Sequence, residues 1–210
     1  ALMTYFQQKG RGQGKNNWHS SKNKNLLASF YMVVDLPVKY HFMLNIITSL
    51  AIQKVLAKYE IATKIKWPND IYVDEKKIAG ILIQNSIMGS YISKSMFGIG
   101  LNLNQYIFES DAPNPISLVH LKPANYDVLF ETHTLLEVLQ FNYNLLQNNS
   151  KKILDDYHYL LYQLEEWKSY ETIIGSIEGK IIGVDDFGRL KILDRSDQQH
   201  AFNMNEVKFL

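Results

Sequence analysis

The segment from Lys64 to Leu103 constrains the fold most, because strand patterns follow one another there with only short turns between them. Pro68 ends the first run, and Asp74–Lys77 turns the chain back before a long apolar run. The runs with strand character are Lys64–Trp67, Ile71–Val73, Ile78–Gln84 and Tyr91–Leu103. The sequence therefore predicts a β-hairpin followed by a further strand.

Helical periodicity flanks these strands on both sides. Apolar residues recur every three or four positions over Val38–Tyr59, and the same spacing returns over Tyr126–Leu146 and Lys151–Leu164. Polar residues that cap helix N-termini precede the last two segments, so we expect Asn125 and Ser150 to be their N-caps.

Short β runs separated by turns make up the C-terminal part of the chain. They are Gly179–Val184, Arg189–Leu193 and Glu206–Leu210. The segment Asp185–Gly188 joins the first two as a hairpin turn. We therefore expect an α+β chain, with one domain over residues 1–167 and a small appended β-barrel over residues 168–210.

The composition excludes several classes of protein. The 210 residues are 46% hydrophobic, which is enough to bury a real core. A net charge of +1 gives no basic excess of the kind that nucleic-acid binding requires. The chain has no cysteine, which excludes disulfide scaffolds, zinc ribbons and thiol nucleophiles. No apolar run approaches the roughly 20 residues that span a bilayer, and we expect a soluble, cytoplasmic protein.

A flexible and positively charged loop, Gln7–Trp18, follows an apolar lead-in with strand character. Its glycines let the backbone approach a ligand closely, and successive N–H groups can then surround an anion. Arg11 adds a planar guanidinium group suited to phosphate or carboxylate. Taken alone, such a loop is more often an ordinary solvated surface loop, so its function depends on the rest of the chain.

Three other segments could complete an anion site. Asp70 could hold Mg²⁺ or could simply close an Asx turn. Lys77 could neutralise a carboxylate or phosphate, or could be an ordinary turn lysine. The glycines of Gly98–Asn104 indicate close approach of a ligand or backbone, or a bulge, and Asn102 could read the edge of a base. Trp18 is either a core anchor or a stacking surface for an aromatic ring.

The order of these motifs along the chain is more specific than any one of them. "GRG" and then Trp18 come first, followed by "KWPND" (Lys66–Asp70), "KIAGILI" from Lys77 and "GIGLNLN" from Gly98. This order resembles the biotin protein ligase family over roughly residues 6–104. The resemblance implies a mixed β-sheet flanked by helices, related to class II synthetases, with an SH3-like barrel at the C-terminus.

The resemblance also implies a two-step reaction. Biotin and MgATP would give biotinyl-5′-AMP, and biotin would then pass to a lysine of a biotin carboxyl carrier domain. The catalytic residues would be Arg11, Lys77 and Asp70, with Asp70 as the metal ligand. Biotin would be bound by Gln7, Gly10, Arg11, Gly12, Gln13 and Lys77. ATP would be bound by Trp18, Lys66, Asn69 and Asn102. A homodimer is a further possibility, whereas this chain shows no helix-turn-helix for DNA binding.

The chain departs from the family in two places. Many members carry further arginines after the position of Gly12, whereas here Lys15 is the next basic residue. Members also begin with a strand and a helix that carry a biotin-contacting Ser/Thr-Thr-Asn segment, which this sequence lacks. We therefore expect that further residues precede Ala1 in the natural protein.

Two rival interpretations remain open. Lipoate ligases and octanoyltransferases resemble biotin ligases in fold, but they use a Gly-Gly-Gly run with a nearby histidine, and the transferases also need a cysteine. Neither feature is present. A non-catalytic biotin-binding regulator is the second alternative. The presence of Arg11, Asp70 and Lys77 argues against it.

Overall fold

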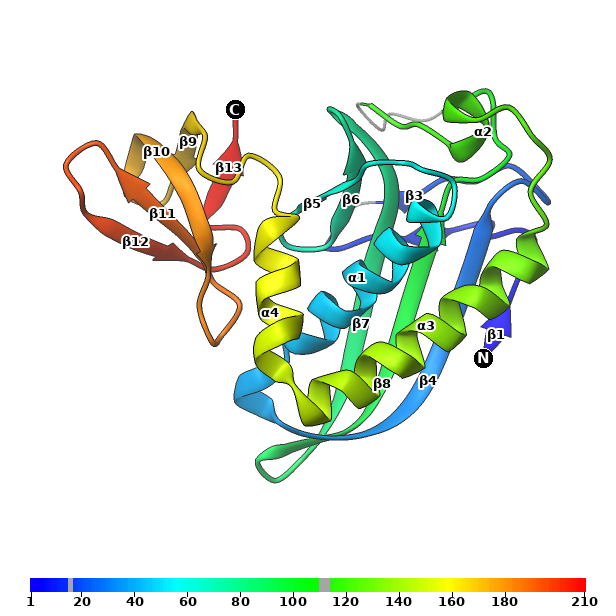
Figure 1. Cartoon of the computed structure of the whole chain (residues 1–210), viewed down its shortest axis with the longest axis horizontal. Coiled ribbons are helices and arrows are strands. Elements are labelled where there is room, and N and C mark those ends of the chain that lie inside the picture. The colour runs from blue at the N-terminus through cyan, green and yellow to red at the C-terminus, as the bar shows by residue number, and fades with distance from the viewer. Residues whose placement is uncertain (15–16, 110–113) are drawn as a thin grey trace.

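Six antiparallel strands form the main sheet, in the order β1-β4-β8-β7-β6-β5 (Figure 1). The computed structural model describes residues 1–14, 17–109 and 114–210, so Lys15 lies outside the described residues. The strands are β1 (Leu2–Met3), β4 (Leu26–Pro37), β5 (Lys64–Lys66), β6 (Asp70–Val73), β7 (Lys76–Met88) and β8 (Tyr91–Leu101). In the described part, parallel pairing near this sheet is confined to the single bridges Ile65–Leu161 and Lys77–Pro115. The strands predicted between Lys64 and Leu103 are confirmed.

Strand β4 was not predicted from the sequence, although it pairs with β8 along most of its length. Its first residues, Leu26–Ala28, are all buried, and the alternation of buried Phe30 with exposed Tyr31 begins only afterwards. A run that is buried on both faces has no period of two, and periodicity alone cannot distinguish it from a helix.

Helices cover one face of this sheet: α1 and α3 lie in front of it in Figure 1, and α4 packs against both beside the sheet. The helices are η1 (Val38–Tyr40, a 3₁₀ turn), α1 (Met43–Ala57), α2 (Leu118–Leu121), α3 (Val128–Asn148) and α4 (Ser150–Tyr159). Their apolar sides pack on the sheet residues in one continuous core. Among the described residues, no helix is both long and apolar enough to cross a membrane.

Both predicted helix caps were wrong by one or two residues. Helix α3 is capped by Asp127, whose carboxylate accepts the N–H groups of Leu129 and Phe130 at 2.9 and 3.1 Å. Helix α4 is capped by Asn149, which accepts the N–H of Lys152 at 3.1 Å. Local sequence offers several capping residues in a row, and backbone geometry selects the one whose oxygen reaches the free N–H groups.

The C-terminal residues form a separate five-stranded antiparallel sheet in the order β12-β11-β10-β9-β13. Its strands are β9 (Trp167–Thr172), β10 (Gly175–Val184), β11 (Leu190–Asp194), β12 (Gln199–Phe202) and β13 (Val207–Phe209). Its buried residues include Tyr170, Ile181 and Ile192. The expected small C-terminal β unit is therefore confirmed, and the domain boundary at residues 167 and 168 stays a prediction.

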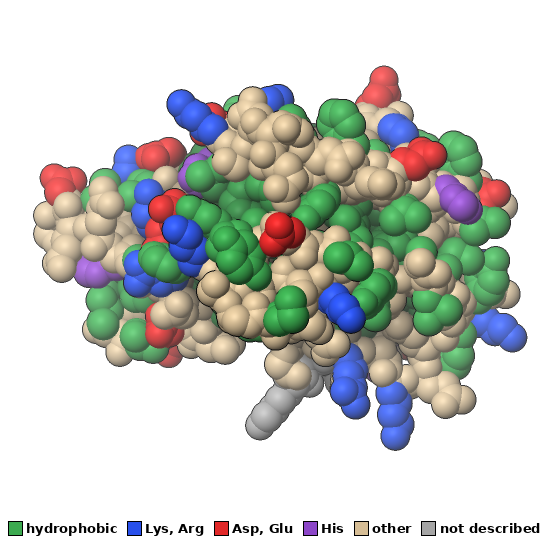
Figure 2. Space-filling view, turned by 90° about the horizontal axis from the view of Figure 1, so that it is seen from below, with side chains coloured by type: hydrophobic (Ala, Val, Ile, Leu, Met, Phe, Trp, Pro, Cys, Tyr) green, Lys and Arg blue, Asp and Glu red, His purple; other side chains and the backbone are tan. Residues whose placement is uncertain are grey.

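The turn between β7 and β8 lies at the lower end of the main sheet in Figure 1. The view from below shows hydrophobic side chains open to solvent at this end of the molecule (Figure 2). At this turn they are Ile87, Met88 and Tyr91. The candidate site is at the other end of β7 and β8.

Candidate active site

A cavity of about 640 Å³ lies between the main sheet and a small hairpin made of β2 (Gly10–Arg11) and β3 (Asn17–Trp18). It opens on the face away from the helices, because its floor residues Gly98 and Gly100 alternate with Phe97 and Ile99, which point into the core. This volume suits a ligand of small-molecule size. The glycine-rich loop predicted to bind an anion therefore forms one wall of a real cavity.

The floor of the cavity is flat because glycines face each other on neighbouring strands. Gly80 of β7 pairs with Gly100 of β8, and the Trp18 indole lies against both. A Cβ atom at Gly100 would be 2.6 Å from Trp18 Cζ2 and 2.8 Å from Trp18 Nε1, which is closer than atoms can approach. The sequence indicated a close approach at Gly100, and the group that approaches is a side chain rather than a backbone.

Two opposite charges meet at the edge of this floor. Lys77 Nζ lies 2.7 Å from an oxygen of Asp70, and the side chains are 32% and 24% exposed. They meet because Asp70 pairs with Gly80, which has no side chain, and the Lys77 side chain extends along β7 to Gly80. Lys77 Nζ is also 5.7 Å from the centre of the Trp18 ring. Arg11, on the hairpin, lines the same cavity.

The turn from β5 to β6 supplies a third side of the cavity through Pro68, Asn69 and Asp70. Asn69 is fixed to β7 by two bonds, because its side-chain amide donates to the Ile81 carbonyl at 2.5 Å and its own carbonyl accepts the Ile81 N–H at 3.1 Å. The turn is therefore tied to the sheet at the position where its polar side chains reach the ligand space.

Two residues that the resemblance assigned to ATP do not line the cavity. The Lys66 ammonium lies 4.9 Å from the centre of the Tyr72 ring and 5.0 Å from that of Phe209, and burial lowers the pKa of this lysine. Asn102 is 3% exposed, and its amide donates to the Ile116 carbonyl at 3.0 Å. Their roles stay predictions from the motif, without support from the cavity's lining.

The other predicted biotin residues do line the cavity. They are Gln7, Gly10, Gly12 and Gln13. Strand β4 adds Leu27, Ala28 and Ser29, which sequence reasoning missed because it assigned no element to that segment. Ser29 pairs with Gly98 in the sheet, and it places a hydroxyl group on an otherwise apolar stretch of floor.

A magnesium ion fits this donor set only as part of a nucleotide complex. Within residues 1–14, 17–109 and 114–210 no group of three His, Asp or Glu side chains could hold a metal. Among the described residues that line the cavity, Asp70 is the one carboxylate, and magnesium commonly binds one or two carboxylates together with substrate phosphates. The site therefore suits an ion that arrives with a polyphosphate.

Known proteins resemble this chain in sequence and in fold. The sequence model of the biotin/lipoate A/B protein ligase family matches residues 3–102, the segment that carries the hairpin, the β5–β6 turn and the glycine floor. Residues 3–102 therefore match the biotin/lipoate A/B protein ligase family. Within this family, the curated relatives and solved structures that it resembles include biotin protein ligases, so the resemblance seen in the sequence motifs is confirmed.

Individual family members are similar along most of this chain. The bifunctional ligase/repressor BirA of Bacillus spizizenii is 28% identical over 196 residues, which cover 86% of this chain and 57% of that protein. The biotin–[acetyl-CoA-carboxylase] ligase of Mycobacterium tuberculosis is 28% identical over 195 residues, which cover 90% of this chain and 71% of that ligase. This chain thus spans little more than half the length of the first relative.

Solved structures of the family share the whole architecture. The biotin protein ligase from Aquifex aeolicus, solved in complex with biotin and ATP, superimposes with a TM-score of 0.82 at 25% sequence identity. The match covers 100% of this chain and 88% of the Aquifex chain. The expected fold class, a helix-flanked main sheet with a small C-terminal β unit, is confirmed.

Proposed function

We propose that this protein is an ATP-dependent ligase that forms biotinyl-5′-AMP and transfers biotin to a lysine of a biotin carboxyl carrier domain. One observation carries the proposal. Arg11, Asp70 and Lys77 come from three separate segments of the chain, and all three line one cavity with a glycine floor. A reaction between two anions needs cations at the reacting centre, which Arg11 and Lys77 would supply, with Asp70 as the metal ligand.

Biotin would lie between the hairpin and the floor. The polar groups of the hairpin, from Gln7 to Gln13, would bind the ureido ring and the carboxylate, while Leu27 and Leu82 cover the apolar ring and tail. Such a small ligand gains affinity mainly from being enclosed, and the hairpin provides the cover.

The first step would join the two substrates. A carboxylate oxygen of biotin attacks the α-phosphorus of ATP, the bond from that phosphorus to the bridging oxygen breaks, and pyrophosphate leaves. Arg11 and Lys77 would offset the charge of the carboxylate and the α-phosphate. The ion pair with Asp70 holds the Lys77 ammonium at the cavity before substrates arrive. Magnesium, bound with the triphosphate near Asp70, would neutralise the departing phosphates.

The second step would consume the mixed anhydride. The ε-amine of the carrier lysine attacks the biotinyl carbonyl carbon, an amide bond forms, and AMP leaves. The hairpin would shield the adenylate from water until the carrier arrives. The Trp18 ring and Asn69 are the nucleotide-binding residues that the cavity supports. A cytoplasmic location and a homodimer accompany this proposal as expectations from the family.

The first experiment measures pyrophosphate release with biotin and MgATP. Turnover with biotin supports the proposal, turnover with lipoate or octanoate instead would favour the lipoate-ligase alternative, and biotin binding without turnover would favour a non-catalytic regulator. We expect Asp70→Asn to raise the magnesium requirement far more than the KM for biotin. The cation at the cavity is tested by Lys77→Ala. Its matched control is Lys76→Ala, at the neighbouring exposed lysine, which should leave turnover unchanged.

A further inference from the structure

The tight turn between β10 and β11 of the C-terminal sheet packs directly against the main domain. The indole N–H of Trp67 donates to the carbonyl oxygen of Gly188 in this turn at 2.9 Å. Trp67 is 5% exposed, so this hydrogen bond is shielded from water. A buried donor that loses its partner is costly, and this contact is therefore a defined link between the two sheets.

The turn is shaped to present that carbonyl. Asp185 accepts the N–H groups of Phe187 and Arg189 at 3.0 and 2.9 Å, and the Arg189 side chain donates to it at 2.7 Å. Gly188 has a φ of +81°, and a Cβ at this position would be 2.6 Å from Cδ2 of Phe42 in the main domain. Only glycine fits there, because both the backbone angle and the neighbouring ring exclude a side chain.

The link reaches the candidate active site within three residues. Trp67 itself does not line the cavity, but the next residues, Pro68, Asn69 and Asp70, do. The preceding residue, Lys66, is also held by the C-terminal sheet, through Phe209 at 5.0 Å. The C-terminal sheet therefore contacts the chain immediately before the turn that carries the proposed metal ligand.

We propose that Trp67 is a positioning residue, and that its bond to the Gly188 carbonyl lets the C-terminal sheet fix the Pro68–Asp70 turn against the cavity. Only the kinetic effect expected from this inference rests on the proposed function. Its structural consequence, the restrained turn, exists in the free protein whatever the cavity binds.

Two substitutions test the link from its two ends in the full chain. Trp67→Phe removes the indole N–H and keeps an aromatic ring, and Asp185→Ala loosens the turn that presents the carbonyl. Each should speed amide hydrogen exchange over Asp70–Val73 about tenfold without ligand, the change expected for one buried hydrogen bond. The double variant should exchange no faster than the more affected single variant, because both changes break the same link.

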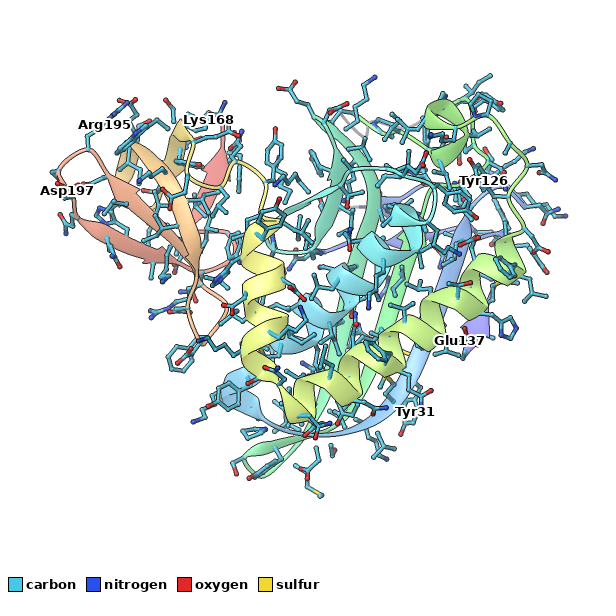
Figure 3. The ribbon with its side chains drawn as sticks, in the orientation of Figure 1. Tyr31, Tyr126, Glu137, Lys168, Arg195 and Asp197 are labelled. Atoms are coloured by element: carbon cyan, nitrogen blue, oxygen red, sulfur yellow. The ribbon has the colours of Figure 1, made fainter. Side chains whose placement is uncertain are left out.

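A control variant separates the loss of this link from the effect of replacing a tryptophan elsewhere in the C-terminal sheet. Trp167→Phe makes the same chemical change in β9, where the ring stacks on Arg195 at 3.7 Å. Figure 3 places Arg195 at the outer end of the C-terminal sheet, away from the main sheet. Exchange over Asp70–Val73 should be unchanged in this control.

Kinetics give the second readout. In Trp67→Phe the KM for MgATP should rise about tenfold, while the Kd for biotin stays within about twofold of the wild type. Unchanged exchange over Asp70–Val73, or equal loss of MgATP and biotin binding, would overturn the inference. If the wild type shows no reaction with biotin and MgATP, the proposed function fails, and the exchange experiment still decides whether Trp67 restrains the turn.

Discussion

The contact between Trp18 and the glycine floor predicts the outcome of one substitution, Gly100→Ala. The added Cβ would be 2.6 Å from Trp18 Cζ2. Carbon atoms pack favourably at about 3.5–4.0 Å, so the indole must withdraw by about 1 Å. Such overpacking costs about 1–3 kcal/mol, and replacing glycine by alanine in a strand returns about 0.5–1 kcal/mol. We expect a net loss of about 1–2 kcal/mol in the free energy of unfolding.

A double-mutant cycle isolates the cause. In a Trp18→Ala background the three atoms nearest to the new methyl group are gone, so Gly100→Ala should become neutral or stabilise by about 0.5–1 kcal/mol. Gly98→Ala is the matched control, because its Cβ would meet the Leu82 carbonyl oxygen at 3.3 Å and not the indole. Its effect should stay within about 0.5 kcal/mol in either background.

Urea unfolding followed by circular dichroism measures all the variants of the cycle. Equal m-values among the variants would show that the differences are differences in stability. If Gly100→Ala costs the same free energy with and without Trp18, the clash with the indole is not the cause, and the argument that the floor is glycine to admit Trp18 fails.

Three other predictions follow from the site and the domain contact. Lys77→Ala should lower pyrophosphate release with biotin and MgATP about 100-fold or more, because the cavity loses a cation at the reacting centre; near wild-type release would remove Lys77 from the mechanism. Amide exchange over Gly10–Gly14 should slow when biotin and MgATP are added, because the hairpin gains contacts with the ligands. Unchanged protection would argue against the hairpin as the cover of the bound ligand. Burial, assisted by Lys191, lowers the pKa of His158, whose Nε2 accepts the Val184 N–H at 3.1 Å. Since the folded pKa lies below the ordinary value of 6.5, the neutral ring stabilises the fold above that pH, and this contribution declines as the pH falls below it. The thermal midpoint should therefore fall less between about pH 7.5 and 5.5 in His158→Gln than in the wild type, and parallel curves would contradict this.

The sequence by itself determined the elements that have strong local signals. The strands from Lys64 to Leu103 follow from alternation and turn residues, and the long helices follow from their three- and four-residue spacing. The order of the motifs from Arg11 to Asn104 indicated the family, because each motif is short and local. Most of the assigned residues do line one cavity, Arg11 and Lys77 among them.

Contacts between segments that are distant in the sequence were decided only by the tertiary structure. Strand β4 was missed because its first residues are buried on both faces, which removes the alternation that marks a strand. The Asn102 amide donates to the carbonyl of Ile116, a contact that the motif around Asn102 did not indicate. The bond from Trp67 to Gly188 joins residues that are 121 positions apart. No local pattern encodes such a pair, because the distance between two side chains is fixed only when both sheets have folded and packed.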